Sequence, residues 1–150
     1  MKKFELTSET KINIFGKKLF RIKALISFGD VEAGETGGWV EKEGNVNQSG
    51  DAWVYGNAMV YGDAMVSGDA KVSGDAEVSG NADYTTIHGF GTQFRTTTFF
   101  RCKDKKVRVA CGCFFGTIPE FREQVKNTRK GKIAEEYLMI ADLMENHFEK

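Results

Sequence analysis

Apolar and small residues recur every six positions through the middle of this chain. From Gly50 the sequence reads GDAWVY GNAMVY GDAMVS GDAKVS GDAEVS GNADYT. Each unit opens with Gly, then Asp or Asn, then Ala, and Val stands fifth in the first five units. A Gly-Asp or Gly-Asn pair favours a turn, and the Ala-x-Val after it is a very short strand with both side chains on one face. The pattern predicts that Ala and Val face a common interior.

Turns at this spacing exclude hairpins, because no strand is long enough to pair and bury a face. Three short strands can instead form a three-sided coil of about eighteen residues that stacks on the next coil. The repeats resemble those of hexapeptide-repeat proteins, in which a small residue follows an aliphatic one by four positions, as Ala58 follows Val54. The resemblance implies a short left-handed parallel β-helix. It says little about function, because enzymes and scaffolds share that coil.

The segments before the repeats predict further β structure. Residues 4–28 alternate apolar and polar positions around a turn candidate at Gly16, which favours a hairpin that caps the open end of the stack. Residues 29–49 read as an irregular first coil with three inward valines, Val31, Val40 and Val46. The expected divisions are therefore an N-terminal β cap (1–28), a β-helix (29–85) and a C-terminal unit (86–150).

The C-terminal unit is expected to contain two strands and two helices. Residues 92–101 and 106–115 are rich in β-branched and aromatic residues, with a turn between them at 102–105. Thr117 and Glu120 have the spacing of a capping box, which predicts a helix over about 118–129. An apolar stripe predicts a second helix over about 132–148. Both helices are amphipathic and must pack on another surface.

Outward positions of the early repeats carry large apolar side chains. We expect these to form a patch too apolar for free surface, covered by the C-terminal helices or by another subunit. Hexapeptide-repeat proteins are usually trimers, so the resemblance and the patch together predict a homotrimer. The predicted interface residues are Trp53, Tyr55, Met59, Tyr61 and Met65.

The charge is zero overall but divided along the chain. Residues 27–83 hold eleven Asp/Glu and two Lys/Arg, a balance of −9, whereas residues 95–132 hold eleven Lys/Arg and three Asp/Glu, a balance of +8. Zero net charge and the lack of an apolar run of about eighteen residues predict no membrane partner. No signal peptide is expected, because the N-terminal stretch is interrupted by Glu5, Glu9, Lys11 and Asn13. The split has two interpretations: turn carboxylates beside a solvated basic face, or a basic segment that meets an anion.

Few residues offer catalysis or metal binding. A hexapeptide acyltransferase would use His88 as general base, whereas His147 reads as a polar-face residue. Two histidines cannot supply the three-histidine zinc site of carbonic anhydrases on this coil. Cys102, Cys111 and Cys113 are read as buried thiols, because a single Gly between paired cysteines is unusual for zinc. We therefore expect no metal and no cofactor. The glycines of residues 88–91 favour a hinge over a phosphate loop.

The basic strand pair is the candidate binding site. Arginine, threonine hydroxyls and aromatic rings together can hold a phosphate and stack a base. The acidic coil beside them would repel a long polyanion, so duplex nucleic acid is not expected. A small phosphorylated ligand or an acidic surface of a host protein fits better, and an ordinary solvated strand face remains the alternative. The candidate ligand-binding residues are Arg95, Thr97, Arg101, Lys103 and Arg108.

The whole chain resembles phage- and prophage-encoded accessory proteins with hexapeptide repeats. The resemblance lies in residues 19–46, in the repeats, and in 107–125 and 134–144. It implies a small protein of the bacterial cytoplasm, with a role in counter-defence or host takeover. The predicted function is that of a non-enzymatic, oligomeric binding protein for a nucleotide-like anion or a host protein. An acyltransferase using His88 and a purely structural assembly module are the alternatives.

Overall fold

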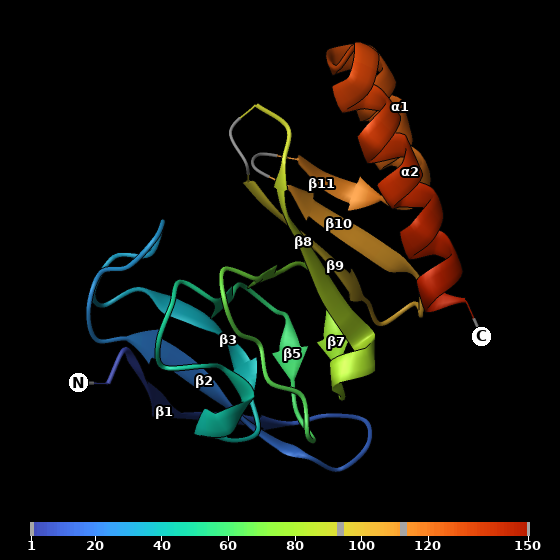
Figure 1. Cartoon of the computed structure of the whole chain (residues 1–150). Helices are drawn as coiled ribbons and strands as arrows, with labels where there is room; N and C mark the ends of the chain where they lie inside the picture. The colour runs from blue at the N-terminus through green and yellow to red at the C-terminus, as the bar shows by residue number, and fades with distance from the viewer. Residues whose placement is uncertain (1, 93–94, 112–113, 150) are drawn as a thin grey trace.

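The described residues of the chain form three separate β-sheets and two helices (Figure 1). The computed structural model describes residues 2–92, 95–111 and 114–149. The largest sheet has the order β1-β2-β3-β5-β7, a second pairs β4 with β6, and an antiparallel sheet has the order β11-β10-β9-β8. The strands are β1 Phe4–Ile12, β2 Lys18–Ala24, β3 Thr36–Val40, β4 Trp53–Val54, β5 Met59–Val60, β6 Lys71–Val72, β7 Glu77–Val78, β8 Tyr84–Phe90, β9 Arg95–Arg101, β10 Val107–Cys111 and β11 Phe114–Thr117.

The N-terminal hairpin forms with its turn at the expected glycine. Gly16 has a φ of +80°, which favours glycine, and β1 pairs with β2 in antiparallel register. Because β2 also pairs antiparallel with β3, the hairpin extends the largest sheet beyond β3, on the side away from β5 and β7. Its role as a cap of the repeats stays a prediction.

The inward positions of the repeats are buried as expected. The repeat strands pair in parallel, and the partners Trp53 and Lys71, like Met59 and Glu77, stand eighteen residues apart. Small and branched side chains fill one interior, the first core cluster. Its Ala and Val residues within 31–78 are Val31, Val40, Val46, Ala52, Val54, Ala58, Val60, Ala64, Val66, Ala70, Val72, Ala76 and Val78.

The predicted fold class is wrong. The sequence favoured a left-handed parallel β-helix, but the strands fall into a mixed five-stranded sheet, a two-stranded sheet and an antiparallel four-stranded sheet. The repeat strands are only two residues long, so each turn interrupts the pairing. The antiparallel strands β1 and β2 then join β3, which makes the largest sheet a mixed one.

The described residues of the C-terminal part form four strands where two were expected. Strand β8 (84–90) pairs with β9 and includes most of the segment 88–91 that was predicted to be a hinge. The segment expected as one strand over 106–115 contains two strands, β10 and β11, which pair with each other. The helices α1 (Ile118–Thr128) and α2 (Gly131–Phe148) lie where predicted, and the capping box of Thr117 and Glu120 forms. No helix within the described residues is long and apolar enough to cross a membrane.

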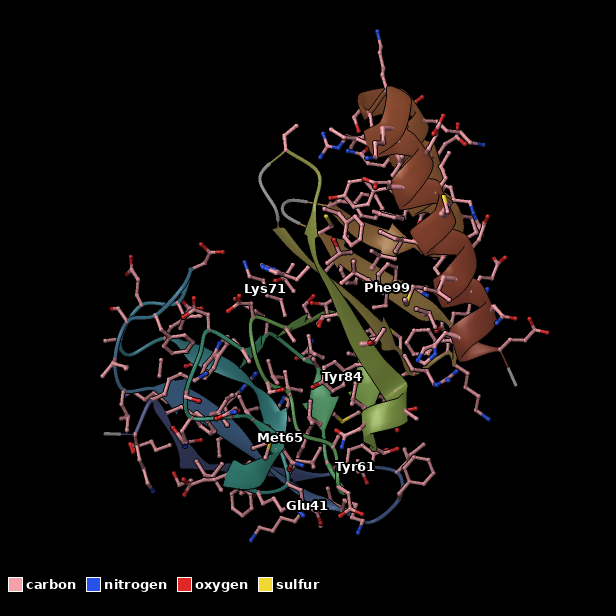
Figure 2. All side chains as sticks on the ribbon, viewed as in Figure 1. Glu41, Tyr61, Met65, Lys71, Tyr84 and Phe99 are labelled. Atoms are coloured by element: carbon pink, nitrogen blue, oxygen red, sulfur yellow. The ribbon has the colours of Figure 1, made fainter. Side chains whose placement is uncertain are left out.

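Side chains of β9 pack into two separate hydrophobic clusters, one on each face of the strand. Successive side chains of a strand point to opposite faces of the sheet. Phe100 accordingly packs into the first core cluster, whereas Phe99 packs into a second cluster under the helices. Figures 1 and 2 show α1 and α2 over one face of the β8–β11 sheet, with Phe99 between sheet and helices. We call β8–β11 with α1 and α2 the helix-covered sheet.

Candidate functional site at the β9–β10 turn

The residues predicted to bind an anion do not form one exposed site. Thr97 is buried, and its hydroxyl donates to the Cys111 Sγ at 3.1 Å. The Arg101 guanidinium donates to Asp83 at 3.1 Å, and that of Arg108 to Asp104 at 2.8 Å. The Arg95 side chain lies outside the described part of the chain. Two of the predicted cations therefore already have carboxylate partners within the protein.

The pair of Arg101 and Asp83 joins the helix-covered sheet to the end of the repeats. Burial alone would raise the pKa of the Asp83 carboxyl, but hydrogen bonds from Ser79 and Arg101 outweigh it and hold that pKa below its usual value. Arg101 also lies over the Phe148 ring, 5.5 Å from its centroid. The guanidinium is thus fixed in place by contacts to both sides.

The exposed cations of this region lie on the β9–β10 turn. Backbone hydrogen bonds of 2.8 and 2.9 Å link Cys102 with Lys105 and Lys106, and the Asp104 carboxylate accepts the Lys106 backbone N–H at 2.9 Å. Lys105 has a φ of +68°. The Lys103, Lys105 and Lys106 side chains are exposed, and none forms an ion pair with another described residue. The turn backbone is therefore held by hydrogen bonds, and it carries three ammonium groups that have no ion-pair partner among the described residues.

Two clefts lie against this turn. The first, which we call the helix cleft, has a volume of about 520 Å³ and lies between the turn, the start of α1 and the end of α2. The second, the hairpin cleft, has a volume of about 470 Å³ and lies between the turn and the tip of the β1–β2 hairpin. Arg101 and Lys105 line both clefts. Both volumes fall in the range of small-molecule sites in proteins, about 300–1,000 Å³.

The lining of the helix cleft combines cations with apolar surface. Its cations are Arg101, Lys105 and Lys106, and its apolar wall contains Ile118, Pro119 and Phe148. The carboxylates of Glu145 and Glu149 stand on the α2 side. Glu145 is paired with Arg122 at 3.1 Å, which offsets part of its charge. The arrangement can accept an anionic group at the turn and an apolar or planar group against the wall.

The apolar patch predicted on the repeats is largely covered by the chain itself. Trp53 is fully buried, with its ring edge-on to Phe4 and Phe28 at 5.8 and 5.3 Å. Met59 and Tyr61 form a small buried cluster with Leu19 and Trp39. Tyr55 is half-buried, and Met65 is 44% exposed. The cover comes from the N-terminal strands and the residues next to them, rather than from the C-terminal helices. The trimer interface stays a prediction, with much less exposed apolar surface to support it.

The other candidate chemical groups lie away from the clefts or are buried. His88 is exposed on β8, with its Nδ1 3.1 Å from the Thr96 hydroxyl oxygen. Cys102 is buried, and burial raises the pKa of its thiol to about 11. Cys113 lies outside the described residues. Within the ranges that the structure describes, no group of three His, Cys, Asp or Glu side chains could hold a metal ion.

The sequence identifies residues 95–132 as basic, and two of the predicted binding residues, Arg101 and Lys103, do line the clefts. Lys105 and Lys106 were not among the candidate residues, and they are exposed on the same turn beside α1 and α2 residues such as Pro119 and Phe148. The KDKK run at 103–106 was the available signal. No protein-family model matches the chain, and a comparison with curated proteins finds no match either.

Proposed function

We propose that this protein is a non-enzymatic binding protein that holds a small phosphorylated ligand in the helix cleft. The observation that carries the proposal is the pairing of uncommitted Lys105 and Lys106 ammonium groups with an apolar wall in one cleft of about 520 Å³. Phosphate oxygens accept charge-assisted hydrogen bonds from such cations. A nucleotide supplies both a phosphate and a planar ring, so a nucleotide-like ligand matches both halves of the lining.

The resemblance to phage accessory proteins supplies the biological setting of the proposal. Such a protein would act in the bacterial cytoplasm, and it would sequester a nucleotide signal in counter-defence or host takeover. The exposed position of His88, with Thr96 as its hydrogen-bond partner, gives no specific support to acyl transfer. A catalytic base needs its substrate within hydrogen-bond reach, and the helix cleft is lined by other residues.

Native mass spectrometry of the full chain purified from bacteria tests this function, followed by titration with ATP, cyclic AMP and a cyclic dinucleotide. We expect at least one phosphorylated ligand to bind. The double variant Lys105→Glu/Lys106→Glu should weaken binding at least tenfold, because it reverses both charges at the phosphate position. Lys130→Glu is the matched control: this exposed lysine between α1 and α2 carries the same charge but does not line the cleft, so binding should be unchanged.

Two results would refute the proposal. One is equal binding by the double variant and the wild-type chain, which would place the ligand elsewhere. The other is no binding by any of these three compounds in the titration together with no phosphorylated molecule carried through purification. His88→Ala provides a second control, and it should leave ligand binding unchanged.

A further inference from the structure

The most exposed large apolar side chains of the described residues gather in two places. At the tip of the β1–β2 hairpin, Ile12, Ile14 and Phe15 are 71%, 87% and 65% exposed. On α2, Met139 and Leu143 are 68% and 55% exposed. Exposed groups of this kind on a folded chain mark interaction surfaces. We call them the hairpin tip and the α2 stripe.

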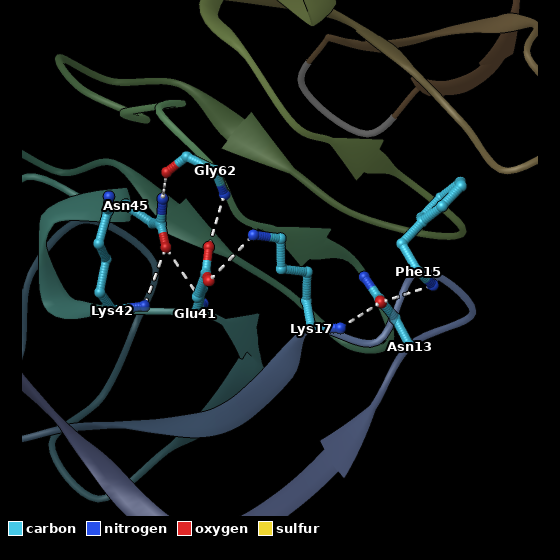
Figure 3. Close-up of polar contacts among 7 residues, drawn as sticks. All are labelled: Asn13, Phe15, Lys17, Glu41, Lys42, Asn45 and Gly62. Carbon is cyan, nitrogen blue, oxygen red and sulfur yellow. Dashed lines mark hydrogen bonds and ion pairs between the residues drawn. The ribbon is translucent and has the colours of Figure 1, made fainter.

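The hairpin tip is held in a fixed shape (Figure 3). The Asn13 side-chain oxygen accepts hydrogen bonds from the backbone N–H groups of Phe15 and Lys17 at 2.9 and 3.0 Å. The Lys17 ammonium lies 3.7 Å from the Glu41 carboxylate, which in turn accepts the Gly62 backbone N–H at 2.9 Å. A turn backbone restrained in this way loses little freedom on binding, so it presents the tip side chains in a pre-organised position.

The α2 stripe lies on one helical face with acidic neighbours. Met139 and Leu143 are four residues apart and therefore adjacent on the helix surface. Glu135 and Asp142 are exposed and lie one turn away from Met139 in the two directions. Residues 131–149 contain five Asp/Glu and one Lys. Arg122 from α1 contacts two of these acids, Asp142 and Glu145, which leaves the stripe with a net negative charge.

The surroundings of the hairpin tip have the opposite charge. Residues 11–18 contain three Lys and no acid, and the neighbouring β9–β10 turn adds three more lysines. Of the acids that line the hairpin cleft, Asp83 is paired with Arg101, whereas Glu77 accepts a hydrogen bond from the neutral Tyr61 hydroxyl at 2.8 Å and keeps its charge. Lys103 and Lys105, which form no ion pair with another described residue, outnumber this one carboxylate, so the free charge of the cleft is positive. A basic apolar surface and an acidic apolar surface thus exist on the same chain.

We propose that the hairpin tip and hairpin cleft of one copy receive the α2 stripe of a second copy. Neither surface is covered within its own chain, so the two surfaces would contact each other between two copies. Met139 and Leu143 would pack against Ile14 and Phe15, with the α2 carboxylates facing Lys103 and Lys105. Two different surfaces meeting in this way form a heterologous contact, which generates a closed ring or an open filament. This inference does not depend on the ligand proposed for the helix cleft.

A mixing experiment tests the heterologous contact directly. One variant, Ile14→Ser/Phe15→Ser, removes the hairpin tip, and a second, Met139→Ser/Leu143→Ser, removes the stripe. Sedimentation equilibrium should show association of the wild-type chain, and each variant alone should associate at least tenfold more weakly. An equimolar mixture should form dimers that grow no further, because each variant keeps the surface that the other lacks. The altered side chains are exposed, so circular dichroism should show unchanged folding.

Two further measurements separate this contact from other modes of assembly. Raising the salt concentration should weaken association several-fold, because exposed opposite charges are screened. Met65→Ser is the matched control, since Met65 is exposed on the repeats at neither surface, and it should associate as the wild type does. A wild-type chain that stays monomeric, variants that associate normally, a mixture that stays monomeric, or dissociation by Met65→Ser alone would each overturn the proposal.

Discussion

The repeats and the helix-covered sheet build their interiors from different side chains. The first core cluster is made mostly of Ala and Val, and each repeat strand that contributes to it is only two residues long. The second cluster is made of rings and long side chains: Phe99, Phe121 and Tyr137 meet edge to face at 6.1 and 5.9 Å. The repeats thus distribute their stabilisation over many small contacts, whereas the helix-covered sheet concentrates it in a few large ones.

The largest expected effect comes from removing one side chain from each core cluster and comparing the losses of stability. Phe99→Ala should lower the free energy of unfolding by about 3–5 kcal/mol, because it opens a cavity under the helices. The matched change Val60→Ala, also at a fully buried site, should cost about 2 kcal/mol, since it removes only two carbons. Urea titration measures both, and equal losses would refute the contrast.

Two spectroscopic signals follow the two regions separately in that titration. Both tryptophans of the chain, Trp39 and Trp53, pack among the N-terminal strands and repeats. The circular dichroism of α1 and α2 reports on the helix-covered sheet. In Phe99→Ala we expect the helical signal to be lost at a lower urea concentration than the tryptophan signal. Coincident transitions would show instead that β9, which serves both interiors, unites them into one cooperative unit.

The sequence predicts the local parts of this structure well. The period of the repeats identified the buried Ala and Val residues, and the spacing of Thr117 and Glu120 identified the start of α1. These features depend on neighbours within a few residues. It did not predict the burial of Trp53 under Phe4 and Phe28, since those contacts join segments tens of residues apart. Repeat periodicity favoured a β-helix, and so it did not predict how the short strands divide into sheets.

The candidate site illustrates the same limit. The sequence showed that residues 95–132 are basic, but Arg101 looked available because its partner Asp83 belongs to the repeats. The exposed lysines follow from the turn geometry, and the apolar wall comes from α1 and the end of α2. Which charges are free is therefore a property of the tertiary contacts.

The turn glycines of the repeats allow a sharper comparison within one region. Gly62 and Gly68 occupy the same position of successive repeats, and both have a φ of +64°. A methyl group at Gly62 would lie 2.5 Å from the Ser79 carbonyl oxygen, whereas one at Gly68 would meet no atom within 4 Å. Ala at either site incurs the left-handed backbone cost of about 1–2 kcal/mol. Gly62→Ala should lose about 1–3 kcal/mol more because of the backbone clash.

Urea unfolding of both variants, followed by tryptophan fluorescence, measures that difference. Equal losses of unfolding free energy in the two variants would mean that the segments containing Gly62 and Ser79 can move apart without a loss of stability. The repeats would then be more loosely packed than their buried side chains indicate. A larger loss in Gly68→Ala would contradict the assigned strand pairing itself. The comparison isolates the spacing between stacked strands, because residue type, φ and repeat position are all matched.

The smallest expected effect concerns the joint between the two regions. Asp83→Asn removes the carboxylate that accepts from Ser79 and Arg101, and we expect a loss of about 1–2 kcal/mol at neutral pH. The folded pKa of Asp83 is lowered, so the wild-type carboxylate contributes its full stabilisation above the unfolded pKa of about 3.9. That contribution disappears as the pH falls through the folded pKa. The stabilities of wild type and variant should therefore converge in acid, as measured by thermal unfolding across a pH series. Phe99→Ala is the control: it changes no charge, so its loss of stability relative to wild type should not depend on pH. If the loss for Asp83→Asn were also the same at every pH, the pair with Arg101 would not hold the two regions together.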